Sequence, residues 1–195
     1  YREKGEWATW RYYQETGNGF TGDWGAHHFD IVQWALGLDG TAPVEYIPAG
    51  YDGTEYTTVK YANGIVMTEQ PFREDDEHAK GIQFIGTDGW IKVARGYIEC
   101  SDPSLLEKSE KEIEAGAYEV SAPHMQDFLD SMRTRLNPIA PVEAGCSTNI
   151  LCCLINIATE LKRPVKWNPV TLSFEGDKEA EAHRLYWYDY RQPYK

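Results

Sequence analysis

The alternation of apolar and polar positions along the chain predicts short strands in its middle and longer helices towards both ends. Strands are predicted over residues 6–14, 44–47, 56–61, 65–69, 82–85, 90–94 and 165–167. Helices are predicted over residues 23–38, 123–135, 142–162 and 177–185, with Asp23 as the N-cap of the first helix. The run Ala62-Asn63-Gly64 is a hairpin turn signal.

Strands that follow one another through tight turns favour an antiparallel sheet. The predicted fold class is therefore α+β, with an open, mainly antiparallel β-sheet and helices packed on one face. The other face of that sheet is then wet, or it is buried against a second domain or another subunit. Three polar segments are expected to lie outside the regular elements: the glycine loop 17–22, the acidic run 74–77 and the excursion 101–118.

Length and charge restrict the possible partners. The 195 residues suffice for one domain, and we expect residues 1–195 to form it. The formal net charge is −12, and no cluster of cations is visible, which disfavours nucleic acid and an anionic membrane surface. No apolar run is expected to approach the roughly 20 residues of a membrane span.

The four cysteines, Cys100, Cys146, Cys152 and Cys153, lack the spacing of a zinc site. We expect them to be buried thiols, which fits a reducing compartment. The chain begins with a polar segment rather than with Met or a signal peptide, so we expect it to start inside a longer protein. Its localisation is therefore left open between cytoplasm and periplasm, with the cytoplasm favoured.

A glycine motif, Gly17-x-Gly19-x-x-Gly22, matches the dinucleotide fingerprint in spacing. We reject that interpretation, because Asp23 would place a carboxylate where the pyrophosphate should meet the helix. The preceding segment is also polar and aromatic, unlike a strand buried on both faces.

The densest polar cluster is Asp23-Trp24-Gly25-Ala26-His27-His28-Phe29-Asp30. On an α-helix, Asp23, His27 and Asp30 share one face. Three interpretations stay open: solvated surface residues, a metal site, or His27 as a general acid/base oriented by a carboxylate. No third strong metal ligand is recognisable, so no metal ion is predicted. Gly25 inside the helix suggests that another group approaches its first turn closely.

The same segment resembles the substrate domain of the glucose–fructose oxidoreductase / inositol dehydrogenase / MocA (Gfo/Idh/MocA) family. The resemblance extends over nearly the whole chain, through residues 10–13, 23–37, 81–91, 124–131, 141–145, 163–167 and 190–194. It implies that this chain is the C-terminal substrate-binding and oligomerisation domain, and that the NAD(P)-binding Rossmann domain lies outside it. The family's catalytic lysine belongs to that other domain and has no match here.

The resemblance also implies roles for individual residues. His27 corresponds to the acid/base histidine and Asp23 to the substrate-site aspartate. The further candidates for substrate binding are Trp10, Arg11, His28 and Asp30. His124 is expected to be structural, and His78 and His183 to be solvated.

The implied activity is the NAD(P)-dependent oxidation of a sugar or polyol hydroxyl, with either NAD or NADP as cofactor. Two alternatives remain: a redox-assisted NAD-dependent glycosidase or lyase, and a non-catalytic oligomerisation module. The expected partners are a sugar or polyol, the Rossmann domain, and further copies of the chain, as a dimer or tetramer through the sheet face.

Overall fold

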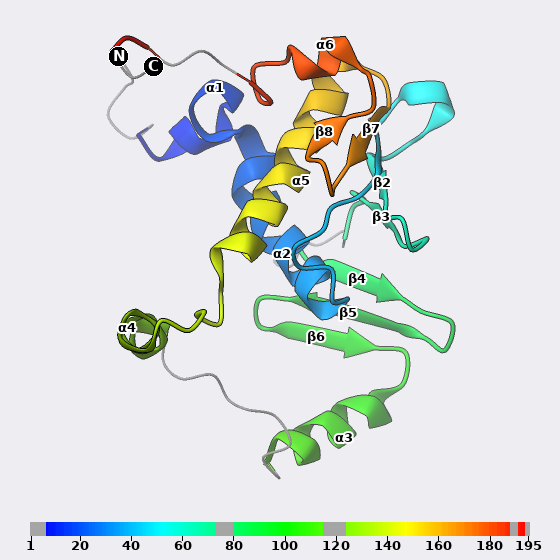
Figure 1. Cartoon of the computed structure of the whole chain (residues 1–195). Helices are drawn as coiled ribbons and strands as arrows, with labels where there is room; N and C mark the ends of the chain where they lie inside the picture. The colour runs from blue at the N-terminus through cyan, green and yellow to red at the C-terminus, as the bar shows by residue number, and fades with distance from the viewer. Residues whose placement is uncertain (1–6, 73–79, 115–123, 188–190, 194–195) are drawn as a thin grey trace. The chain divides into compact units, whose positions relative to one another are not determined.

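Two compact units make up the chain: residues 1–70 with 142–195 (unit 1), and residues 71–141 (unit 2). The computed structural model describes residues 7–72, 80–114, 124–187 and 191–193, and Figure 1 labels their helices and strands. The predicted acidic loop over residues 74–77 and His78 lie outside the described residues. Because each unit is described by itself, the expectation of a single domain stays a prediction.

Helices and short helical turns surround a sheet in unit 1. They are η1 (Trp7–Tyr12), α1 (Gln14–Gly17), the π-helical turn η2 (Thr21–Gly25), α2 (Ala26–Ala35), η3 (Tyr51–Gly53), α5 (Val142–Leu161) and α6 (Lys178–Glu181). Its strands are β1 (Glu45–Ile47), β2 (Thr58–Lys60), β3 (Val66–Thr68), β7 (Val165–Asn168) and β8 (Ser173–Phe174), in the antiparallel order β3-β2-β1-β7-β8.

Alternation along the central strands gives this sheet two different faces. Tyr46 of β1 stands opposite Val59 on one side and Val165 on the other, and all three side chains are buried. One position away, Glu45 stands opposite Lys60 and forms an ion pair with it at 2.8 Å. A period of two therefore separates a buried apolar row from an outward charged row.

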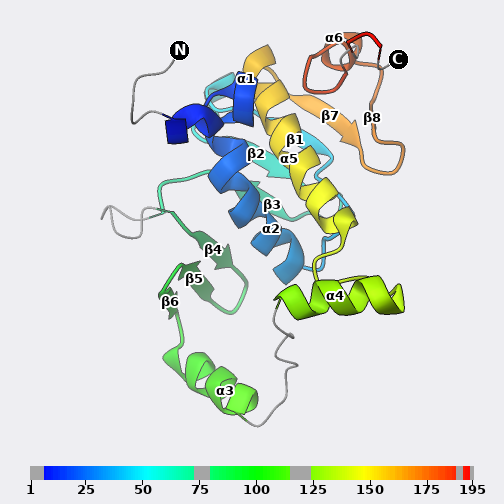
Figure 2. The same ribbon diagram turned by 90° about the vertical axis from the view of Figure 1, so that its left-hand side faces the viewer.

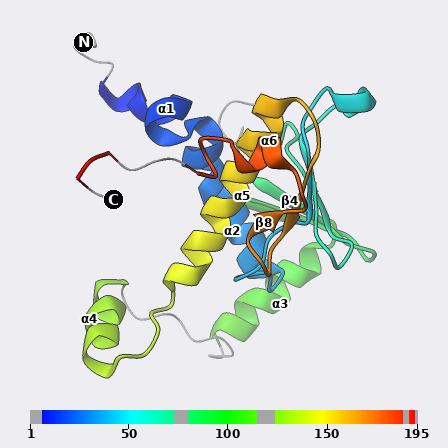
Figure 3. The same ribbon diagram turned by 45° about the horizontal axis from the view of Figure 1, so that its top comes forward.

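The buried face is covered by α5, which packs on β1 and β7, while α2 packs on α5. Figures 2 and 3 show both helices on the same side of the unit 1 sheet. The observed fold class, an α+β arrangement of antiparallel sheet and helices, agrees with the prediction.

The helix α5 has the length and composition of a possible membrane span, contrary to the expectation that no run comes close. Half of its most apolar stretch is buried inside the structure, and Leu151, Leu154 and Ile155 belong to the hydrophobic core. A core helix meets the same criterion, and that is how α5 is used here.

Unit 2 contains a second antiparallel sheet, in the order β4-β5-β6. Its elements are β4 (Ile82–Ile85), β5 (Trp90–Ala94), β6 (Tyr97–Cys100), α3 (Pro103–Glu114) and α4 (His124–Thr134). The prediction of an irregular excursion is wrong for α3. The side chain of Asp102 accepts a hydrogen bond from the Ser104 amide at 3.0 Å, and Pro103 suits a first turn, so a helix start was present in the sequence.

The predicted strand over residues 6–14 is also wrong, because η1 and the start of α1 occupy its described part. Local hydrogen bonds satisfy this backbone. The hydroxyl of Thr16 donates to the carbonyl of Trp10, and the amide of Gly17 donates to the carbonyl of Tyr13 at 2.9 Å. The predictions for α4, α5, β4 and β5 are confirmed. The two-residue strand β8 and β6 were not predicted.

Candidate functional site

The candidate site lies in unit 1, where a reversal of the chain brings η1 against η2. Asn18 makes this reversal in the left-handed conformation (φ 61°, ψ 19°). Asn156 of α5, which is only 4% exposed, donates from its side-chain amide to the Asn18 carbonyl at 2.9 Å and to Oδ1 at 2.8 Å. The buried core helix therefore fixes the turn that precedes the site.

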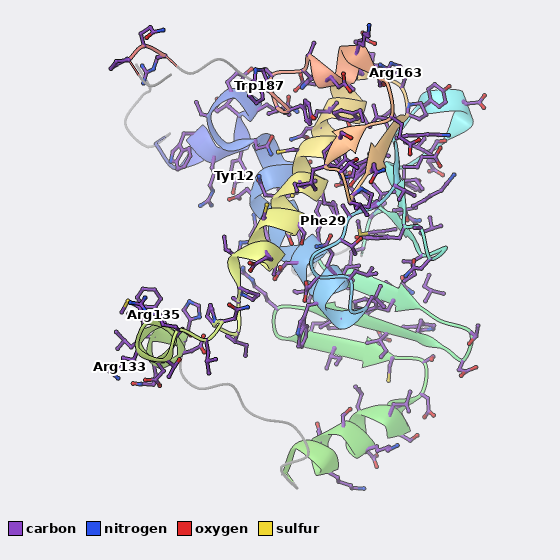
Figure 4. The ribbon with its side chains drawn as sticks, in the orientation of Figure 1. Tyr12, Phe29, Arg133, Arg135, Arg163 and Trp187 are labelled. Carbon is purple, nitrogen blue, oxygen red and sulfur yellow. The ribbon has the colours of Figure 1, made fainter. Side chains whose placement is uncertain are left out.

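Glycines allow the backbone to close on itself here. A Cβ on Gly17 would collide with the backbone of Arg11, and one on Gly22 would lie 2.6 Å from the Cβ of Asn18. Gly25 would meet the ring of Phe29 at 2.9 Å, which is the close approach that a glycine inside the helix suggested. Figure 4 labels Phe29, which belongs to the core of unit 1.

An ion pair joins the two segments across the reversal. Nε of Arg11 lies 3.4 Å from Oδ2 of Asp23, with the two side chains 48% and 23% exposed. The same guanidinium donates from Nη2 to the hydroxyl of Tyr12 at 3.2 Å and lies 5.1 Å from the centre of its ring. This hydrogen bond from Arg11 lowers the pKa of the Tyr12 phenol, and a second one from Trp24 adds to the effect.

Trp24 connects this ion pair to the histidines. Its ring centre lies 6.1 Å from that of His27, at an edge-on angle of 64°, and 6.1 Å from that of His28. His27 is exposed, whereas His28 is half-buried. The structure therefore gathers Arg11, Tyr12, Asp23, Trp24 and His27 at one surface of unit 1, and we call these five residues the site cluster.

Sequence reasoning missed two members of the site cluster. Trp24 was not among the candidate residues, although its spacing to both histidines was a usable signal. Tyr12 was not a candidate either. Its partners Arg11 and Trp24 come from η1 and η2, and nothing in the sequence pattern predicts that these two turns meet.

Asp23 is not an N-cap, contrary to the prediction. The preceding Phe20 already has helical angles (φ −63°, ψ −35°), and Asp23 lies inside the π-helical turn η2. Within the described residues, Asp23 is paired with Arg11, and no hydrogen bond links it to His27. The expected role of Asp23 as an orienter of the imidazole therefore has no contact to support it.

Asp30 faces a different group. Its Oδ1 accepts a hydrogen bond from the hydroxyl of Thr148 on α5 at 3.2 Å. Gln33, which is fully buried, donates to Ser147 at 3.0 Å and to Thr148 at 3.4 Å, and it accepts from Tyr61 at 3.4 Å. This buried polar network fixes the rotation of α2 against α5, and with it the direction in which His27 points.

Three further residues named in the sequence analysis have other surroundings. Trp10 is 48% exposed, and its carbonyl accepts a hydrogen bond from the hydroxyl of Thr16. His124 begins α4 in unit 2 and is exposed. His183 was expected to be solvated, but its side chain is only 9% exposed and its Nε2 lies 3.0 Å from Oε2 of Glu160.

The four cysteines are free, but they are not all buried. Cys100 and Cys152 are buried and Cys153 is half-buried, whereas Cys146 is exposed on the first turns of α5, next to the buried Ser147. Burial raises the pKa of Cys152 to about 12 and also raises that of Cys153. Both thiols therefore stay protonated at neutral pH and are poor nucleophiles.

The glycine loop does not fit a dinucleotide. Atoms of Arg11 and Asn18 occupy the space beside the Cα atoms of Gly17 and Gly22. The space that a pyrophosphate would need is therefore taken by the protein itself. Asp23 adds negative charge at the same turn. Among the described residues, no group of three His, Cys, Asp or Glu side chains is arranged to hold a metal ion.

Comparison with known proteins identifies the family. The sequence model for the oxidoreductase family, C-terminal alpha/beta domain, matches residues 1–195. No curated protein and no solved structure matches the chain. The match spans the whole chain and agrees with the residues that carry the resemblance, so the chain belongs to the Gfo/Idh/MocA oxidoreductase family and is of its C-terminal α/β domain type.

Proposed function

We propose that this chain forms the substrate-binding face of an oxidoreductase that acts on a sugar or polyol hydroxyl. The family match supports the general class, an oxidoreductase. The observation that carries the finer proposal is the site cluster, where one indole contacts two imidazoles beside an Arg–Asp pair. Aromatic faces and paired polar groups together suit a ligand with many hydroxyls and an apolar C–H face.

Three residues of the site cluster have distinct roles in this proposal. His27, exposed on α2, accepts the proton of the substrate hydroxyl as the carbon that bears it is oxidised. The closest approach of Asp23 to Arg11 is 3.4 Å, and the carboxylate keeps lone pairs that accept a second substrate hydroxyl. Trp24 provides the ring surface.

NAD or NADP supplies the hydride acceptor in this proposal. Because the glycine loop is filled by the chain itself, we assign the binding of the dinucleotide to a part of the enzyme outside these 195 residues. His28 and Asp30 then act at the edge of the substrate site or behind it, Asp30 through Thr148. Assembly through the outward sheet face also stays a proposal, and the pair Glu45–Lys60 on that face is what a partner would have to match.

The test is a panel of sugars and polyols of different stereochemistry, offered to the complete enzyme with NAD and with NADP. Reduced cofactor together with a keto-sugar supports the proposal. Bond cleavage without net reduced cofactor would move the protein to the redox-assisted glycosidase or lyase class.

The matched variants are His27→Gln and His124→Gln. We expect His27→Gln to lower kcat by about 10²- to 10⁴-fold, the usual contribution of a general base, with an unchanged unfolding curve. His124, exposed at the start of α4, serves as the control histidine and should keep wild-type turnover. Wild-type turnover in a folded His27→Gln enzyme would contradict the assignment.

A further inference from the structure

The Tyr12 phenol belongs to the site cluster but has no role in the proposed function. It is 39% exposed at the end of η1. Its hydroxyl oxygen accepts from Nη2 of Arg11 at 3.2 Å and from the Trp24 side chain. Both of these groups can only donate, so the phenol acts as an acceptor twice.

A phenol oxygen that accepts twice still carries its own proton. Among the described residues, the structure records no acceptor for the hydroxyl proton of Tyr12. Since Arg11 and Trp24 occupy two sides of the phenol oxygen, its proton is directed towards the surface. Tyr12 and His27 both contact Trp24, so the two side chains are neighbours of the same indole.

We propose that Tyr12 is a further substrate-contacting residue, whose hydroxyl donates a hydrogen bond to a second oxygen of the substrate beside the one held by His27. The favoured substrate class is then a vicinal diol, in which two neighbouring carbons carry oxygen. This inference rests on the proposed function and adds a specificity element to it. Arg11 is the positioning residue, since it holds Tyr12 on one side and Asp23 on the other.

The electrostatics support a donor role. The hydrogen bond from Arg11 lowers the pKa of the phenol, and a more acidic hydroxyl is a stronger donor. The same shift limits the range of this role, because the phenol loses its proton at a lower pH than an ordinary tyrosine does. Substrate binding should therefore weaken on the alkaline side as Tyr12 ionises.

The experiment compares the complete enzyme with its Tyr12→Phe and Tyr51→Phe variants, on the best diol of the panel and on the matching mono-ol. Tyr51 is the control because it is 42% exposed, close to the 39% of Tyr12, and lies in the separate turn η3. We expect Tyr12→Phe to lower kcat/KM for the diol by about tenfold, the effect of one lost hydrogen bond. The mono-ol should change by less than about twofold, because it does not use that bond.

The pH profile separates substrate contact from a merely structural role. In the wild-type enzyme, kcat/KM for the diol should fall on the alkaline side, and in Tyr12→Phe this fall should be absent. A structural role would lower activity at every pH and for both substrates without moving the alkaline limb. That result would overturn the inference.

A second readout needs no activity. Alkaline titration of the tyrosinate absorbance should lose its earliest component in Tyr12→Phe and keep it in Tyr51→Phe. Persistence of that component in Tyr12→Phe would contradict the lowered pKa of the Tyr12 phenol. If the wild-type enzyme oxidises no sugar or polyol, the proposed function fails and takes this role with it, whereas equal kinetics of the two tyrosine variants on an active enzyme sink the inference alone.

Discussion

Two Arg–Asp pairs in unit 1 differ in how completely their groups are used. Arg163 meets Asp177 with two parallel hydrogen bonds, of 2.6 and 2.8 Å, and also donates to Glu179 at 2.7 Å. The closest atoms of Arg11 and Asp23, Nε and Oδ2, lie 3.4 Å apart. The two pairs lie in different parts of the unit: Figure 4 labels Arg163 beyond the end of α5 and Tyr12 beside η1.

The difference distinguishes a structural ion pair from the proposed binding surface. Asp177 accepts from Arg163 with both oxygens and also caps α6 through the Ala180 amide at 3.1 Å. A planar guanidinium paired in this way has little capacity left for a ligand. The Arg11–Asp23 pair keeps unused donors and acceptors at the surface, which is what a site for a polyhydroxyl ligand requires.

The comparison assumes that α2 is held by its buried network and not by the open pair. Replacing Gln33 by Leu tests this, because it leaves the hydroxyl of Tyr61 buried without its acceptor. We expect the free energy of unfolding to fall by about 1–3 kcal/mol, the cost of an unsatisfied buried polar group. Denaturant titration measures the change.

The control is the double variant with Tyr61→Phe, which removes the orphaned hydroxyl. In that background the cost of Gln33→Leu should shrink by about 1 kcal/mol or more. Equal costs in both backgrounds would show that Gln33 acts through packing alone. A larger stability loss from Arg11→Gln than from Gln33→Leu would reverse the comparison itself.

The sequence predicted those parts of the fold whose signals are local. The bounds of α5 differ from the prediction only at the last residue. A long apolar run of this kind strongly indicates where a helix begins and ends. The aromatic alternation over residues 6–14 misled the prediction. The structure of that segment depends on the hydrogen bond from Thr16 and on the close packing of Gly17 against Arg11. An alternation of apolar and polar residues carries no information about either contact.

The candidate site was predictable in composition but not in pairing. Asp23 and His27 share a face on an ideal α-helix, but the π-helical turn at residues 21–25 changes the local geometry. The partners observed for Asp23 and Asp30 are Arg11 and Thr148, which come from other elements. Tertiary contacts of this kind leave no periodic trace in one sequence, which is also why the contact of His183 with Glu160 was missed.

The second prediction exchanges the two arginines for glutamine. Arg163→Gln should lower the free energy of unfolding by about 1–2 kcal/mol, because it breaks a bidentate, partly buried pair. Arg11→Gln should cost clearly less than Arg163→Gln, because the contact of Arg11 with Asp23 is longer and more exposed. Thermal and denaturant unfolding of the two variants, measured side by side, give the ratio.

Activity should show the opposite order. Arg11→Gln removes the group that holds Tyr12 and Asp23, so we expect kcat/KM of the complete enzyme to fall by about tenfold or more. Arg163→Gln should keep wild-type kcat/KM below its unfolding temperature. Equal stability losses in the two variants would show that the Arg11–Asp23 pair also has a structural role.

The smallest effect concerns pH. The hydrogen bonds from Arg163 lower the pKa of Asp177 in the folded chain, so this carboxylate stabilises the fold fully above its unfolded pKa of about 4. That stabilisation is lost as the pH falls through the lowered pKa of the folded state.

Asp177→Asn keeps a capping side chain but removes the charge, and should therefore cost about 1 kcal/mol or less at pH 7. The difference from wild type should narrow as the solution is acidified, while the exposed Asp39→Asn should stay within about 0.5 kcal/mol of wild type throughout. A difference for Asp177→Asn that stays constant with pH would mean that the cap, and not the charge of the closed pair, holds this end of the chain.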